Sequence, residues 1–208
     1  KVKGWKYTKQ QEKIIASAQH FKVENNDYIL QETGNSNCKL LAINGSERVT
    51  YELESTFNGF PLKIDNKGTL HAITFEGKLW RGTINGNATE LSIPEVNNQS
   101  FFTIDNTKSK ENEQYIIANE NSFFIADKEF EILSSFQLNE KIQKIFTFRK
   151  YIVVETLNQL YLYNDEKVVE GFPIQTDGLF NISDIQNNGK INIINSRNGA
   201  LYNFELAD

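Results

Sequence analysis

The sequence predicts an all-β fold made of five similar repeats. Three observations carry this prediction: a two-part hairpin unit recurs along the chain, Asn-Gly pairs occupy many turns, and the three prolines fall between strand candidates. At intervals of roughly 40 residues, successive units place equivalent apolar residues at Tyr28, Leu70, Tyr115, Ile152 and Ile191. Four short strands per repeat of about this length are typical of a propeller blade. We therefore predict a β-propeller-like domain of five four-stranded blade repeats.

Each repeat is expected to contain one strand before the hairpin, the hairpin itself and, in four repeats, one strand after it. The hairpins are predicted at 27–30 with 39–43, 69–73 with 78–81, 114–118 with 122–126, 151–155 with 159–163, and 190–195 with 200–206. The preceding strands are predicted at 19–23, 61–65, 101–105, 144–148 and 179–184. The following strands are predicted at 47–53, 89–93, 130–138 and 167–171. Apolar residues between Leu138 and Phe146 also fit helical spacing, so a short helix competes there.

Turn and face patterns agree with this scheme. Asn-Gly occurs at 44–45, 58–59, 85–86, 188–189 and 198–199. Asn and Gly tolerate positive φ, so this pair closes tight hairpins. Tyr202 and Phe204 alternate with polar neighbours, as a half-exposed strand requires. The run from Tyr151 to Val154 is apolar throughout, which suits an inner strand packed between blades.

A second repeated phrase, Gly-aromatic-x-apolar, begins at Gly4, Gly59 and Gly171. We expect its aromatic residue to fill the seam between two blades. The fifth repeat has only three strand candidates, which leaves an unpaired sheet edge. We hypothesise that residues 1–7 pair beside 200–206 and close the ring. In the competing arrangement, residues 2–5 belonged to an earlier blade and the five blades form an open arc.

Composition and charge limit the function classes. The chain has 208 residues, of which 39% are hydrophobic and 24% charged, and its net charge is −5. We read residues 1–208 as one domain. The chain starts at Lys1 and contains no Met, so we expect a processed chain or the C-terminal part of a longer protein. An acidic balance argues against nucleic-acid binding. The absence of a long apolar run predicts no membrane span, and we expect a monomer.

The final repeat resembles a blade of quinoprotein-like or FG-GAP-type propellers. Those families carry Gly-Phe-Pro, a short strand, Asp-x-Asn-x-Asp-Gly, a strand and Gly-x-Leu-Tyr, which Gly171–Pro173, Asp184–Gly189 and Gly199–Tyr202 match in part. The resemblance implies a bacterial, extracytoplasmic protein, periplasmic or extracellular, that acts as an interaction scaffold. Some members are enzymes with a quinone cofactor. For this chain we predict no cofactor.

A degenerate calcium loop is the sharpest candidate for a metal site. Its ligand positions hold Asp184, Gln186, Asn188 and Asn192, and Lys190 lies among them. Calcium requires six to eight oxygen ligands, several of them carboxylates. Because only one carboxylate remains, we predict a metal-free turn in which side-chain oxygens cap the backbone. Residues 65–68 form a more reduced copy of this loop.

Other residues that could bind a ligand or react have simpler structural interpretations. Trp80 and Arg81 could form a platform for a sugar or a peptide, although a Trp that fills a seam between blades explains the same pattern. Cys38 is the only cysteine, so it forms no intrachain disulfide, and we read it as a partly buried strand residue. His20 and His71 lack the neighbouring ligands of a zinc site and read as surface or strand residues.

We therefore predict a non-catalytic binding or scaffold module whose loops at one end recognise a protein or a glycan. The alternative is a carbohydrate-active enzyme of the glycosidase type, with acids in an axial pocket. Asp105 and Asp184 are the candidates for those acids because they end equivalent strands. The same position also suits capping of the following turn by side-chain oxygens.

Overall fold

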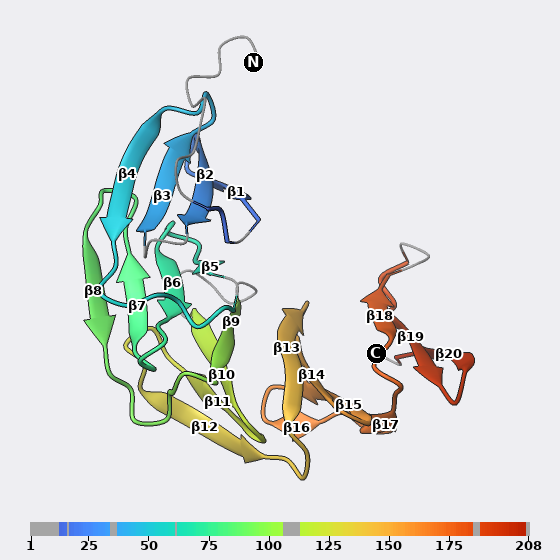
Figure 1. The fold of residues 1–208 in the computed structure, drawn as a ribbon. Coiled ribbons are helices and arrows are strands. Elements are labelled where there is room, and N and C mark those ends of the chain that lie inside the picture. The colour runs from blue at the N-terminus through green and yellow to red at the C-terminus, as the bar shows by residue number, and fades with distance from the viewer. Residues whose placement is uncertain are drawn as a thin grey trace. The chain divides into compact units, whose positions relative to one another are not determined.

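The structure, a computed structural model, describes residues 13–15, 17–33, 37–60, 62–105, 113–184 and 188–206. These residues form five antiparallel sheets, and the strands of each blade follow one another in chain order (Figure 1). The all-β prediction is confirmed. In the described part of the chain, no helix has the length and apolar character that crossing a membrane requires.

The chain divides into two compact units, residues 1–111 and 112–208, and each unit is described by itself. The prediction of one domain over 1–208 stays a prediction. In the first unit, one sheet contains β1 (Gln19–Val23), β2 (Asn26–Thr33), β3 (Asn37–Ala42) and β4 (Glu47–Glu52). The next contains β5 (Lys63–Ile64), β6 (Leu70–Ile73), β7 (Leu79–Gly82) and β8 (Ala88–Leu91).

The remaining three sheets complete the series. The third contains β9 (Phe101–Asp105), β10 (Gln114–Asn119), β11 (Ser122–Ala126) and β12 (Ile132–Gln137). The fourth contains β13 (Ile142–Phe148), β14 (Tyr151–Thr156), β15 (Gln159–Asn164) and β16 (Lys167–Val168), and β17 (Ile174–Gln175) also pairs with β15. The fifth contains β18 (Phe180–Ser183), β19 (Asn192–Arg197) and β20 (Ala200–Glu205). All five predicted hairpins are therefore confirmed.

The short helix considered between Leu138 and Phe146 is wrong, because β13 occupies this stretch. The register of β13 against β14 shifts between Ile142 and Lys144, which marks a β-bulge. A bulge inserts one extra residue into a strand, so residues three apart can face the same side. Ile142 and Ile145 are both buried. Because of the bulge, their spacing of three residues is the same as that of neighbours on one face of a helix.

One of the five Asn-Gly pairs closes a two-residue hairpin turn in the predicted way. In the turn between β19 and β20, Asn198 and Gly199 both have positive φ, 52° and 72°. Two consecutive residues of positive φ are what a two-residue hairpin turn requires, and Asn-Gly adopts them at low cost.

The apolar cores lie between adjacent sheets within each unit. In the first unit, Leu30 and Leu40 of the first sheet join one buried cluster with Leu70 and Trp80 of the second. In the second unit, Val153 and Leu162 of the fourth sheet pack with Ile193 of the fifth. A blade therefore buries both faces of its inner strands only when a neighbouring blade covers it. This explains why the run from Tyr151 to Val154 is apolar throughout.

The repeated Gly-aromatic phrase lies at the junctions between sheets. The Phe60 ring packs against Phe101 with centroids 4.9 Å apart, and Phe172 packs against the buried cluster of the second unit. The third copy, with Trp5, lies outside the described residues. Among the residues that the structure describes, the fifth sheet has three strands, as predicted. Residues 1–7 are not among the described residues, so ring closure stays a prediction.

Candidate functional site

Two glutamates occupy the same place in two repeats, which the inspection of sequence motifs missed. Glu32 is the fifth residue of the phrase Tyr-Ile-Leu-Gln-Glu-Thr in β2, and Glu155 is the fifth residue of Tyr-Ile-Val-Val-Glu-Thr in β14. Each is followed by a threonine whose hydroxyl donates a hydrogen bond to a carbonyl oxygen across the hairpin. The acceptors are Asn37 and Gln159, both at 3.2 Å. The matching phrase and turn show that Glu32 and Glu155 are equivalent positions.

Both glutamates are largely buried. Glu32 is 8% exposed and Glu155 is 9% exposed. Among the described residues, none donates a hydrogen bond to either carboxylate or forms an ion pair with it within 4 Å. Burial disfavours the charged form and raises the pKa of both residues, and nearby Lys144 partly offsets this rise for Glu155. Buried acids usually have a partner, so this pair is unusual.

Each glutamate lines a cavity at the junction with the next sheet. The cavity beside Glu32 has a volume of about 350 Å³ and is called the Glu32 pocket. Ser17 and Gln19 supply its polar lining, and its apolar lining comes from Ile15, Phe57 and Phe60. Ile15 is 53% exposed and Phe60 is 40% exposed, so apolar side chains form an accessible rim.

The cavity beside Glu155, called the Glu155 pocket, measures about 430 Å³ and is bounded by Lys144 and by Gly178–Phe180 at the start of the fifth sheet. The two pockets differ in the residue beside the glutamate. Glu155 lies opposite Lys144 in the register of β13 and β14. Beside Glu32, the Ile15 amide donates to the Glu32 carbonyl over 3.3 Å, so an uncharged residue stands there. The lining of the Glu155 pocket therefore includes a lysine, whereas the described lining of the Glu32 pocket contains no lysine or arginine.

A second polar cluster joins Asp65 and His71 in the second sheet. The Lys67 and Thr69 amides donate to Asp65 Oδ1 over 2.8 and 2.7 Å, which closes the turn after β5. His71, wholly buried in β6, places Nε2 3.1 Å from Asp65 Oδ2. Burial opposes the charged form of Asp65, but the hydrogen bonds from His71 and Thr69 outweigh it and hold its pKa below the ordinary value. The pair therefore connects the turn after β5 to the buried face of β6.

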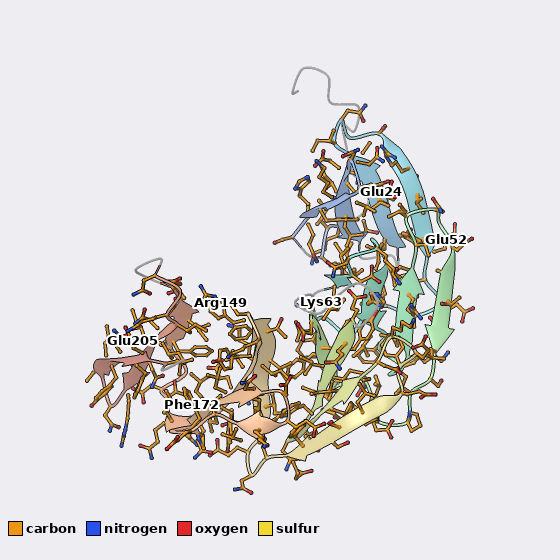
Figure 2. The ribbon with its side chains drawn as sticks, turned by 180° about the vertical axis from the view of Figure 1, so that it is seen from behind. Glu24, Glu52, Lys63, Arg149, Phe172 and Glu205 are labelled. Carbon is orange, nitrogen blue, oxygen red and sulfur yellow. The ribbon has the colours of Figure 1, made fainter. Side chains whose placement is uncertain are left out.

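An arginine lies at the degenerate calcium loop. Arg149, in the turn between β13 and β14 and labelled in Figure 2, donates to Asp184 Oδ2 over 2.9 Å and to the Gly189 carbonyl over 2.6 Å. The Asn188 and Gly189 amides also donate to the Asp184 carboxylate, over 3.0 and 2.8 Å. Burial opposes ionisation of Asp184, but the Gly189 and Arg149 hydrogen bonds keep its pKa low. The Arg149 guanidinium thus stands where a bound cation would be needed.

The other predicted ligands do not converge with Asp184. The Asn188 side chain accepts from the Lys190 amide over 2.9 Å, and Gln186 lies outside the described residues. Asn192 is buried, and its Oδ1 has no hydrogen-bond partner among the described residues. In the same part of the chain, no three His, Cys, Asp or Glu side chains are grouped so that they could hold a metal ion.

We expect calcium titration calorimetry to show no dissociation constant below about 10⁻⁵ M, the affinity range of calcium sensors. One carboxylate that already binds an arginine cannot repay the dehydration of the ion. Arg149→Gln serves as the control, because it removes the competing cation without adding a carboxylate, and it should also fail to bind. A heat signal in the sensor range for the wild-type chain would contradict this prediction.

The remaining candidates are placed individually. The Trp80 ring is 2% exposed and contacts Tyr51 and Phe57, each with centroids 5.2 Å away. A ring covered in this way cannot stack on a ligand without unpacking the core, so its placement agrees with the seam-filling alternative. Arg81 is half-buried beside it on β7. Cys38 belongs to the same buried cluster, and burial raises the pKa of its thiol.

His20 and Asp105 are the two remaining polar candidates. His20 lies on β1 with Nε2 2.9 Å from Asp27. Asp105 is buried at the end of β9 in the first unit, whereas Asp184 belongs to the second unit.

Comparison with known proteins identifies the fold. No protein-family model and no curated protein matches the sequence. The structure of Saccharomyces cerevisiae Sqt1 matches with a TM-score of 0.66 at 15% identity, over 92% of this chain and 59% of that one. BBS1N in complex with ARL6DN matches with a TM-score of 0.62 at 11% identity, over 97% of this chain and 68% of that one. BamB from Moraxella catarrhalis matches with a TM-score of 0.54 at 12% identity, over 89% of this chain and 62% of that one.

Dos1 is described as a propeller and matches with a TM-score of 0.57 at 12% identity, over 81% of this chain and 50% of that one. This chain has the β-propeller fold. It spans 59% of the length of Sqt1. At such low identities, the likeness shows the fold alone.

Proposed function

We propose that the chain is a non-catalytic β-propeller module that binds a protein, with the Glu32 pocket as its recognition site. One observation carries the proposal: a buried carboxyl group, unpaired among the described residues, lines an open cavity whose rim is apolar. Leaving such a group without a partner has a cost in stability. Ligand sites are typically apolar clefts in which a few polar groups fix the orientation of the ligand.

The lining favours a protein over a glycan. Ile15 and Phe60 offer exposed aliphatic and aromatic surface, and protein interfaces bury such residues around a few polar groups. Among the similar structures, BBS1N was solved in complex with ARL6DN. That complex concerns that protein, and it supports binding here only as an example of what the fold can do.

The enzyme alternative requires a second acid. Glycoside hydrolysis uses two carboxyl groups on either side of the scissile bond. Of the described residues that line the Glu32 pocket, Glu32 is the only acid. Asp184 is held by Arg149 and by two backbone amides, as a turn-capping side chain would be. These observations support binding over hydrolysis as the proposed function.

The proposal also includes the family of the chain and the compartment in which it acts. The resemblance of the last repeat to quinoprotein-like or FG-GAP-type propellers supports an exported or surface-attached bacterial scaffold. We propose a monomer for the unbound chain.

Affinity capture with matched variants tests the proposal. The immobilised chain is exposed to an extract of the producing cells as wild type, Phe60→Ser and Leu157→Ser. Leu157 is 68% exposed and lines neither pocket, so it controls for the loss of an apolar side chain. We expect at least one protein to be retained by wild type and by Leu157→Ser but not by Phe60→Ser, and to bind again after purification.

Identical retained sets for all three chains would contradict the proposed site. A glycan panel run in parallel tests the enzyme alternative. Hydrolysis that is lost in Asp105→Asn or Asp184→Asn would favour the enzyme.

A further inference from the structure

We infer that the Glu32 pocket receives one cationic side chain, lysine or arginine, from the bound protein. This inference rests on the proposed function and specifies its chemistry. The Glu155 pocket provides the argument, because the same repeat position there is already supplied with a cation by the chain itself.

The cation of the Glu155 pocket is Lys144, which lies opposite Glu155 in the backbone register of β13 and β14. Its ammonium group lies 5.2 Å from the Phe146 ring centroid and 5.6 Å from that of Phe180. These distances are within the range of a cation–π interaction. In this seam, a buried acid and two aromatic rings are therefore accompanied by one amino group.

The described lining of the Glu32 pocket contains an acid and two aromatic rings but no cation. Phe57 and Phe60 supply the aromatic surface, Glu32 supplies the carboxylate, and Ser17 adds a hydroxyl to the lining. Lys39 on the neighbouring strand β3 pairs with Glu47 at 3.8 Å and so has its own partner. Compared with its counterpart, the part of the pocket that the structure describes has no ammonium or guanidinium group.

A long basic side chain fits the shape as well as the charge. Lys and Arg bury their aliphatic stems against apolar surface and keep the charged head at a polar group. A volume of about 350 Å³ is near the lower end of ligand pockets, which suits one side chain. A hydrogen bond between a cation and a carboxylate is stronger than one between neutral groups. The cation would also favour the ionised form of Glu32, opposing the effect of burial.

The test uses n-butylguanidinium as a mimic of the arginine side chain and n-butylurea as its uncharged counterpart of similar shape. Both are titrated into the full chain and followed by amide chemical shifts in NMR. We expect n-butylguanidinium to shift the amides of 17–19, 31–33 and 57–60 with a saturable, millimolar dissociation constant. We expect n-butylurea to bind at least tenfold more weakly.

Three variants assign the effect to the predicted groups. Glu32→Gln should remove the preference for guanidinium over urea. Ser17→Lys should block the pocket by supplying an internal cation, as Lys144 does for Glu155. Lys144→Ser should create a new guanidinium site, seen as shifts at Gly178–Phe180. The inference is overturned if the two probes bind wild type equally, if Glu32→Gln keeps the preference, or if no saturable shift occurs.

This outcome is separable from that of the proposed function. A captured partner that depends on Phe60 but binds Glu32→Gln normally would keep the proposed function and overturn the cation inference. If guanidinium binding changes as expected in all three variants but no captured partner depends on Phe60, the pocket chemistry stands and the proposed function is overturned.

Discussion

Replacing Trp80 by alanine is expected to lower the free energy of unfolding by about 3–5 kcal/mol, the range for large aromatic residues in a core. Trp80 is almost fully buried between the first and second sheets, where it contacts Tyr51 and Phe57. A Cβ added to Gly82 would collide with the same indole ring, so the space around it is tightly filled. The deletion leaves a cavity that this seam cannot close by small shifts.

Urea unfolding followed by circular dichroism measures this loss. Trp80→Phe should cost less because it keeps an aromatic ring, and it remains informative if Trp80→Ala does not fold. Leu157→Ala, at an exposed turn, is the control and should change the free energy by less than about 0.5 kcal/mol. An equally small change for Trp80→Ala would show that the indole does not hold the seam together.

Replacing Asp65 by alanine is expected to lower the free energy of unfolding by about 3 kcal/mol, the scale for breaking a buried polar pair. The carboxylate accepts hydrogen bonds from two turn amides, and its other oxygen contacts the buried His71 ring. Removing it leaves these groups without their acceptor inside the second sheet. Asp27→Ala breaks an exposed contact with His20 and should cost less than about 0.5 kcal/mol.

The effect of Asp65 should also depend on pH. The pKa of Asp65 is lower in the folded chain than its ordinary value of 3.8. A lowered pKa means that its stabilisation is present above that value and is lost as the pH falls through the folded pKa. The difference in stability between wild type and Asp65→Asn should therefore be largest near neutral pH and narrow below about pH 4. A difference that stays constant from pH 7 to pH 3 would contradict this assignment.

Local sequence was sufficient for the repeat and its hairpins. Each hairpin depends on a turn of a few residues and on apolar residues in the two strands beside it, so the sequence around it carries the necessary information. Asn198 and Gly199 illustrate this, because their tolerance of positive φ directly determines the turn. The equivalence of Glu32 and Glu155 was also present in the sequence, as a shared Glu-Thr ending, and comparison of the repeats residue by residue would have found it.

Only the tertiary structure decided which polar residues meet and which are buried. Arg149 and Asp184 come from different blades, so no local pattern could pair them. The strand at Ile142 depended on a bulge, which is a property of its alignment with β14. Glu32 shares its pocket with Phe57 and Phe60, which come from the segment that leads into the next sheet. The sequence by itself determined the blades and their turns, since these are short-range. The seams between blades, and the pockets in them, were decided by the packing of one blade against the next.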